Sequence, residues 1–340
     1  MPFATEAKMG PDTRARIAWF LNVVGPFLGL LLVIGLFSIR PEVRAGFLTG
    51  GNFKIIFTQT VIVASCALGM TMIIVSGGID LSMGSVVALV SVVGAKLLEL
   101  QSRTPPIIIS PFVVAAVMIA AGALVGLVNA TLIAGFRMLP FIVTLGMMGI
   151  ARGTGKWLAD NVAVNYDDKS PLNNLMTLEE PYSFFPLPPG VWAVIGVALV
   201  MALVMKHTVF GRYIFAIGSN EATARLCGIR VPLMKIVIYT VAGLFVGLAG
   251  LLQMSRLAVG DPTVAVGLEL DVIAAVVIGG ASLNGGTGTI LGSMIGALIM
   301  AVLRNGSNQM GWSTSAQEII IGIVIVLAVG IDKLRQRKNA

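Results

Sequence analysis

The chain alternates between apolar runs and short polar segments along most of its length. Many of the runs approach the roughly 20 residues that a helix needs to cross a bilayer. The runs predict about ten spans, with a short eighth and ninth, over residues 17–38, 57–78, 82–99, 107–134, 140–158, 190–205, 235–254, 269–282, 289–303 and 315–331. Because the alternation typical of a transmembrane barrel is absent, we expect an all-α, polytopic transmembrane helical bundle.

Four polar segments separate or flank these runs. They are the two ends of the chain, at residues 1–16 and 332–340, an acidic, proline-rich segment at 159–189 and a basic one at 206–234. None is long enough to form a domain, so we expect one transmembrane domain over residues 1–340. The first apolar run exceeds the ~7–15 residues of a signal-peptide core, which predicts an uncleaved span.

Basic residues predict the orientation of the chain in the membrane. The tail after Asp332 and the segment 206–234 are both basic, and the four spans between them place both on the same side. Since Lys and Arg favour the cytosolic side, we expect both termini and residues 206–234 in the cytosol. Residues 159–189 then face outward.

The composition supports a membrane protein and excludes other classes. Hydrophobic residues make up 56% of the chain and charged residues only 11%, against about 25% in soluble domains. The net charge of +7 comes from residues scattered between apolar runs, which argues against a nucleic-acid partner. Cys66 lies in an apolar run and Cys227 in the basic segment, so we do not expect them to pair.

The sequence contains an internal repeat. Residues 77–95 align with residues 279–297 without a gap, and Asp80 meets Ser282 while Ser82 meets Asn284. The identical pairs are Gly77/Gly279, Gly78/Gly280, Leu81/Leu283, Gly84/Gly286, Leu89/Leu291, Ser91/Ser293, Gly94/Gly296 and Ala95/Ala297. Double glycine ends a helix, and the four polar residues are types that cap the start of one.

Each copy therefore predicts a helix, a Gly-Gly break and a second, capped helix. Asp80 would complement the positive end of the new helix. Two interpretations remain open: a capped turn near the inner membrane face, or a broken helix that lines a transport route. Paired, glycine-interrupted segments in two halves of a transporter often mark the substrate route.

The basic segment predicts a short helix over residues 219–228. Ser219 and Asn220 offer an N-cap, Glu221 suits the first turn, Arg225 suits the last turn, and Gly228 suits the stop. A helix of about two turns is not stable alone, so we expect it to pack on a partner or on the spans.

Three stretches now show a resemblance to a known family. SGGIDLSMGSVVAL, FAIGSNEATARLCGI and ELDVIAAVVIGGASLNGGTGTILGSMIGALI resemble the signatures of the sugar-type permeases of bacterial ABC importers. That family comprises ribose, xylose, arabinose and galactose permeases, with branched-chain amino-acid permeases as more distant members. The resemblance covers roughly residues 50–330.

The resemblance implies a permease subunit in the bacterial inner membrane that imports a monosaccharide. It also implies an ABC ATPase that holds ATP and Mg, a periplasmic or extracellular sugar-binding protein, and a second permease subunit. The coupling segment that contacts the ATPase would contain Gly218, Ser219, Asn220, Glu221, Ala222, Arg225 and Gly228. Cys227 departs from the small residue that is common at its position.

A neutral sugar needs hydrogen-bonding groups and an aromatic face along its route. The candidates among the spans are Ser82, Asn129, Phe141, Thr144 and Asn284, each of which could instead serve helix packing. The candidates at the two breaks are Gly77, Gly78, Asp80, Gly279 and Gly280. Glu269 and Asp271 are expected at the outer rim, where they would meet the binding protein or cap a short helix.

The sequence offers no catalytic constellation, and we predict no enzyme activity, metal site or cofactor in this chain. GTGKW at residues 153–157 lacks the glycine and hydroxyl positions of a phosphate-binding loop, and His207 is the only histidine. The alternative function is a single-chain secondary transporter or facilitator of a small polar solute.

Overall fold

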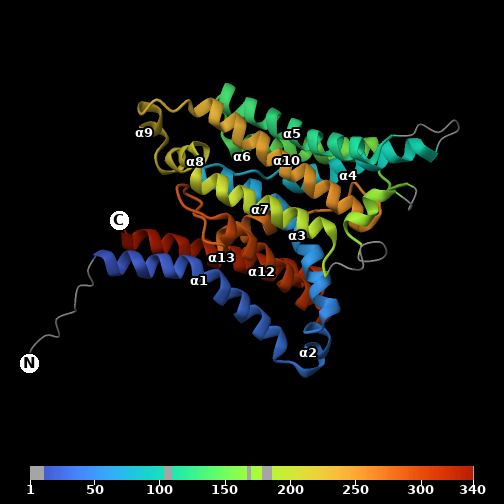
Figure 1. Cartoon of the computed structure of the whole chain (residues 1–340), viewed down its shortest axis with the longest axis horizontal. Helices are drawn as coiled ribbons and strands as arrows, with labels where there is room; N and C mark the ends of the chain where they lie inside the picture. Colours follow the sequence, from blue (N-terminus) through green and yellow to red (C-terminus); the bar gives the residue numbers. More distant parts are fainter. Residues whose placement is uncertain (1–10, 103–108, 167–169, 178–185, 340) are drawn as a thin grey trace, which may run out of the picture.

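The computed structural model describes residues 11–102, 109–166, 170–177 and 186–339, and these are mostly helical (Figure 1). The α-helices are α1 (Pro11–Ser38), α2 (Pro41–Phe47), α3 (Gly50–Val75), α4 (Met83–Glu99), α5 (Pro111–Gly135), α6 (Pro140–Leu158), α7 (Pro189–His207), α8 (Val209–Ser219), α9 (Glu221–Leu226), α10 (Val231–Leu257), α11 (Leu268–Ile278), α12 (Ile290–Gln309) and α13 (Thr314–Asn339). Two 3-10 turns, Leu100–Ser102 and Pro171–Leu175, and the strands β1 (Val164–Asn165) and β2 (Val259–Gly260) complete the described part. The predicted all-α bundle is confirmed.

Helix α3 is the central element of the bundle. Every side chain from Val61 to Ser76 is buried, which fits a helix that is apolar on all sides. Helices α10, α12 and α11 pack directly against it, and α4 follows it in the chain. The core of the protein therefore surrounds α3.

Each of the ten predicted apolar runs coincides with a helix, but the count of about ten spans is not confirmed. Among the described residues, five helices are long and apolar enough to cross a membrane: α3, α5, α7, α10 and α12. Helix α4 has 17 residues and α11 only 11. Both are short because the Gly-Gly breaks interrupt the backbone beside them.

Helices α5 and α10 approach each other through glycines. Gly122 and Gly126 of α5 face Tyr239, Gly243 and Gly247 of α10, and a Cβ on any of the four glycines would collide with backbone atoms of the opposite helix. Close backbone approach through small residues at i and i+4 is a common way for helices to associate in lipid. Van der Waals contact between the two backbones holds this pair together.

The internal repeat persists at the level of local structure, with one difference. After α3, the Asp80 carboxylate accepts a hydrogen bond from the Ser82 N–H at 2.8 Å; after α11, the Ser282 hydroxyl accepts one from the Asn284 N–H at 3.3 Å. The first break is followed at once by α4, as predicted. In the second copy the capped helix does not begin at Ser282 or Asn284, because a loop runs on to Thr289, which caps α12 instead.

The described parts of the two long polar segments contain secondary structure that the sequence did not predict. Within residues 159–189, β1 pairs antiparallel with β2, so this segment is tied to the chain that follows α10. Within residues 206–234, an 11-residue helix, α8, precedes the short helix that was predicted. The amphipathic pattern of α8, with buried Ile214 and Ile217, was the signal for it.

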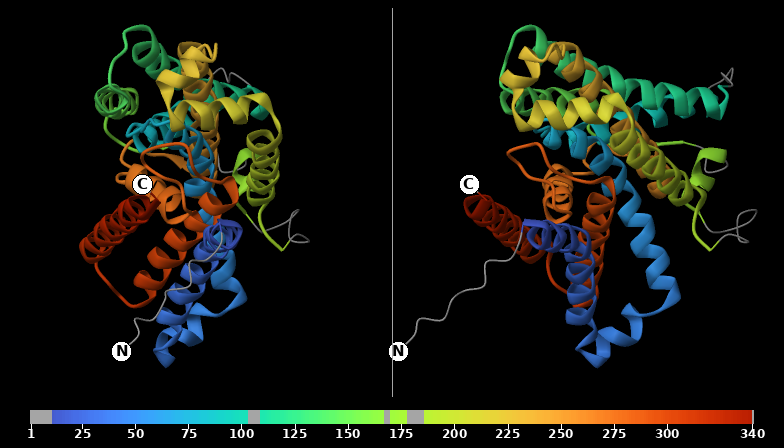
Figure 2. Two further views of the ribbon diagram at one scale, coloured as in Figure 1. Left: turned by 90° about the vertical axis from the view of Figure 1, so that its left-hand side faces the viewer. Right: turned by 60° about the vertical axis from the view of Figure 1, so that its left-hand side comes forward.

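The two ends of the bundle are distinct. Helix α9, the start of α1 and the last turns of α13 lie at one end, which we call the α9 end (Figures 1 and 2). Helix α2, the start of α3 and the end of α12 lie at the opposite end, which we call the α2 end.

The glycine contact between α5 and α10 generates a stability prediction. We expect Gly243→Ala to lower the free energy of unfolding by about 1–3 kcal/mol, because its Cβ meets the Gly122 carbonyl and backbone must move. The measurement is the melting temperature of the detergent-solubilised protein. Gly149→Ala in α6 is the control, since its Cβ meets nothing within 4 Å; equal melting temperatures for the two variants would contradict the prediction.

Candidate functional site

The predicted coupling segment forms a capped helix at the α9 end. The Asn220 side chain accepts a hydrogen bond from the Thr223 N–H at 2.9 Å, and Gly228 adopts φ +85° where the helix ends. Ala224 is buried against α8 and α10, whereas Ala222 and Leu226 are exposed. Leu226 is 88% exposed and, together with Ala222, gives α9 an apolar contact surface.

Glu221 attaches α9 to α10. Its carboxylate lies 2.8 Å from the Lys235 ammonium and 2.8 Å from the Arg225 guanidinium. The hydrogen bond from Lys235 is the main reason that the pKa of Glu221 is lowered, although its partial burial opposes this; Arg225 adds a smaller effect. The helix thus has a charged tether at its first turn.

Gly218 places the end of α8 against the end of α3 and against the loop before α12. A Cβ at Gly218 would collide with the Val75 carbonyl at the end of α3 and would lie 2.6 Å from the Gly286 nitrogen. Gly286 in turn donates a backbone hydrogen bond to the Val75 carbonyl at 2.9 Å. The three residues form a backbone junction, which we call the Gly218 junction, between the α8–α9 segment, α3 and the loop before α12.

A polar group is buried at the start of α4. The Ser82 hydroxyl donates to the Asp80 carboxylate at 2.6 Å, and the Asn129 amide of α5 donates to the Ser82 oxygen at 3.2 Å. Ser82 therefore contributes to the Asp80 turn and forms no side-chain cap of its own. The cavity beside these groups measures about 10 Å³, room for about one water molecule and too small for a sugar.

Of the remaining route candidates, only Thr144 lies beside the Asp80 turn. Its buried hydroxyl donates to the Pro140 carbonyl at 3.0 Å within its own helix and lies 3.5 Å from the Ile79 carbonyl, whereas the Phe141 side chain is 53% exposed. Asn284 lies exposed in the loop that leads to the Gly218 junction. Asp80, Ser82 and Asn129 meet one another, but Phe141 does not line the cavity beside them.

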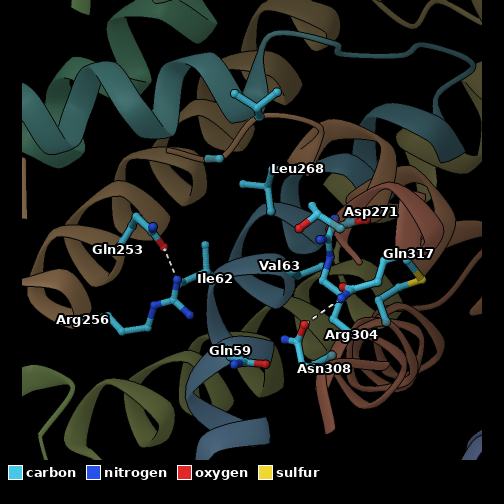
Figure 3. Close-up of a pocket in the computed structure, with 15 residues that line it drawn as sticks. Gln59, Ile62, Val63, Gln253, Arg256, Leu268, Asp271, Arg304, Asn308 and Gln317 are labelled. Atoms are coloured by element: carbon cyan, nitrogen blue, oxygen red, sulfur yellow. Dashed lines mark hydrogen bonds and ion pairs between the residues drawn. The ribbon is translucent and has the colours of Figure 1, made fainter. Parts of the chain in front are cut away.

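Figure 3 shows a larger polar cavity of about 370 Å³. It lies toward the α2 end, because the first half of α3 and the last turns of α12 line it. Its polar side chains come from five helices: Gln59 of α3, Gln253 and Arg256 of α10, Asp271 of α11, Arg304 and Asn308 of α12, and Gln317 of α13. Polar residues inside apolar helices are costly and mark functional sites. The sequence does show polar residues within apolar runs at Arg304 and Gln253. It does not show that they share a cavity, because no spacing rule relates residues on five separate helices.

Charged and amide groups are arranged in pairs around this cavity. The Arg304 guanidinium donates to the Asp271 carboxylate at 2.7 Å, and the Gln317 amide donates to the Asn308 oxygen at 2.7 Å (Figure 3). Asp271 lies in the first turn of α11 and is only 3% exposed, so its side chain faces the cavity. Its second oxygen, Oδ1, is buried and has no hydrogen-bond partner among the described residues.

The buried helix, the glycine-packed spans and the polar cavity define a membrane transport subunit. The part of the chain that the structure describes contains no group of His, Cys, Asp or Glu that could hold a metal ion. Comparison with known proteins agrees with this class: a family model described as the permease component of branched-chain amino acid transport systems matches residues 52–329. The chain belongs to this permease family.

Three relatives illustrate the membership. The ribose import permease of Escherichia coli K12 is 39% identical over 90% of this chain and 93% of its own length. The ribose import permease of Bacillus subtilis is 37% identical over 97% and 98%, and the L-arabinose ABC transporter permease of Azospirillum brasilense is 34% identical over 98% and 94%. No solved structure matches the chain.

Membership confirms the resemblance that the three sequence stretches carry. The chain is an integral inner-membrane permease of the ABC importer class, in which a separate subunit hydrolyses ATP.

The tether at Glu221 generates a pH prediction. A spin label on exposed Cys227 should be immobilised at neutral pH and mobile in acid, since protonation of Glu221 releases Lys235 and Arg225. Because the folded protein lowers the pKa of Glu221, the tether is fully present above the ordinary glutamate pKa and is lost only as pH falls through the lowered value. Electron paramagnetic resonance in detergent measures this, and buried Cys66 should stay unlabelled.

Matched substitutions complete this test. In Glu221→Gln the label should be mobile at every pH, whereas Glu318→Gln, which changes an exposed glutamate of α13, should behave as the wild type. A wild-type profile in Glu221→Gln would disprove the tether.

Proposed function

We propose that this chain is the membrane subunit of an ATP-driven importer of a monosaccharide. The observation that carries the proposal is its near full-length similarity to ribose and L-arabinose permeases. In this assembly an ABC ATPase binds the α9 end, a sugar-binding protein docks at the α2 end, and a second copy of the chain completes the pore. Both termini and residues 206–234 then lie in the cytosol.

The α8–α9 segment is the element through which the ATPase moves the pore. The exposed side chains of Ala222 and Leu226 offer an apolar surface to a groove on the ATPase, and the Glu221 tether keeps α9 at a fixed angle to α10. At its other end, the Gly218 junction touches α3 and the loop before α12 by backbone alone. A displacement of α9 would therefore reach the end of α3 and the loop before α12 together.

The cavity near the α2 end is the section of the route where the sugar enters. Its volume of about 370 Å³ falls within the usual range for small-molecule sites. Sugar hydroxyls both donate and accept, so they can bond the Gln59 and Asn308 amides. Arg304 neutralises Asp271, which suits a route for an uncharged solute.

Reconstitution tests the proposed function. The permease is assembled in proteoliposomes with its ATPase and binding protein, and uptake of radiolabelled ribose, L-arabinose and other monosaccharides is measured. We expect uptake of one sugar that requires ATP and both partners. Flux through the permease alone would instead establish a secondary transporter or facilitator.

The cavity generates a prediction of its own. Gln59→Leu should lower sugar uptake about 2- to 10-fold, because one lost hydrogen bond is worth about 0.5–1.5 kcal/mol. Protein yield and basal ATPase activity should not change, since Gln59 lies far from α9 along α3. Gln309→Leu is the control, because Gln309 follows Asn308 in α12 but does not line the cavity. If both variants transport sugar as the wild type does, the cavity is not on the route.

A further inference from the structure

A second large cavity, of about 650 Å³, lies at the α9 end between α7, α8 and the start of α12. It is lined by Ala202, Met205, Lys206, Arg212, Phe215, Gly288, Thr289, Ile290, Leu291, Gly292 and Ile295. No part of the coupling segment or of the polar cavity contributes to it. Its walls are mostly apolar, and the two charged residues that line it, Lys206 and Arg212, are both basic.

The turn between α7 and α8 creates this cavity. Thr208 ends α7 by donating its hydroxyl to the Val204 carbonyl at 2.7 Å, and the same oxygen accepts from the Gly211 N–H at 3.3 Å to start α8. Gly211 is required at the corner, because a Cβ there would collide with the Met205 carbonyl. The sharp corner places Lys206 and Arg212 on either side of one opening.

Both bases are exposed, and neither is in an ion pair with a described residue. Two cations at the mouth of an apolar groove match a molecule that has an anionic head and a hydrocarbon body. A basic pocket between membrane helices at the cytosolic face is the usual form of a phospholipid headgroup site.

We propose that this cavity binds an anionic phospholipid of the inner leaflet. Lys206 and Arg212 bond the phosphate, and an acyl chain lies along Ala202, Phe215 and Ile295. The proposal rests on the proposed function only for the orientation that places the α9 end in the cytosol. The site itself follows from the cavity and its charges.

A second copy of the chain fits this groove less well than a lipid. The elements that line or adjoin the groove, which are α7, α8, α9 and residues 279–289, carry one acidic side chain, Glu221. Glu221 already pairs with Lys235 and Arg225. A second copy that docked through these same elements would therefore bring no free carboxylate to the two bases, whereas every anionic phospholipid brings a phosphate.

The position of the groove gives the lipid a regulatory role. Phe215 and Arg212 belong to α8, whose last residues form the Gly218 junction. A lipid wedged between α7, α8 and α12 holds α8 in place, and α8 carries the segment that the ATPase would move. Anionic lipid should thus support coupling without contacting sugar or nucleotide.

The test measures lipid binding to the full-length permease in detergent, with no ATPase and no sugar. Phosphatidylglycerol and phosphatidylcholine are titrated separately, and binding is read by native mass spectrometry. We expect phosphatidylglycerol to be preferred, and the preference to fall about 25-fold in Lys206→Gln/Arg212→Gln, because each base near the surface contributes about 5-fold. Ala202→Trp, which fills the groove without changing charge, should lose the preference too.

Arg137→Gln/Arg230→Gln is the matched control, because it removes two exposed bases that do not line the cavity. An unchanged preference in the Lys206/Arg212 variant, or an equal loss in the control, would overturn the site. Displacement of the lipid by excess inorganic phosphate would show a free-anion site instead and also overturn it. Dissociation of a permease dimer in the Lys206/Arg212 variant, with lipid binding unchanged, would assign the groove to a second copy.

Transport measurements separate this proposal from the proposed function. If the lipid preference behaves as expected but ATP-driven sugar uptake is absent, the proposed function fails and the lipid site stands. If uptake is present and identical in phosphatidylglycerol and phosphatidylcholine liposomes while binding is as expected, the site stands and its role in coupling is rejected.

Discussion

Backbone contact through glycine is the constraint on which the rest of this structure depends. In lipid the hydrophobic effect does not drive helices together, so close packing must supply the attraction. The α5–α10 pair shows this directly, because Gly122 and Gly243 leave no room for even one methyl group. The position of α10 follows from this contact, and α10 in turn packs against α3 and α4. A chain with 40 glycines can build many such contacts.

The same constraint explains how movement at one end could reach the spans. At the Gly218 junction there is no flexible side chain between α8, the end of α3 and Gly286 that could absorb a displacement. A rigid contact of this kind transmits force well and tolerates substitution poorly. The Gly-Gly breaks, in contrast, let the chain turn, because Gly77 and Gly280 adopt positive φ and the backbone changes direction there.

The molecule has few charged residues, and these differ in whether they have a partner of opposite charge. Asp271 is paired with Arg304 inside the polar cavity, and Glu221 is paired at the surface of the α9 end. Lys206 and Arg212 form no ion pair with any acidic residue that the structure describes. In a chain that is 11% charged, each unpaired or half-paired group is therefore a better guide to function than any overall charge balance.

The sequence by itself determined the helical bundle, the positions of its apolar helices, the capped helix at Glu221–Leu226 and the internal repeat, because these depend on local spacing, caps and glycine pairs. It could not establish how many helices span, because Gly-Gly breaks shorten some of them. Only the tertiary structure assembled Gln59, Gln253, Asp271 and Arg304 around one cavity. Only it brought Gly218 onto the end of α3. Both arrangements join residues far apart in the chain, and the packing of α3 against its neighbours decides which of them meet.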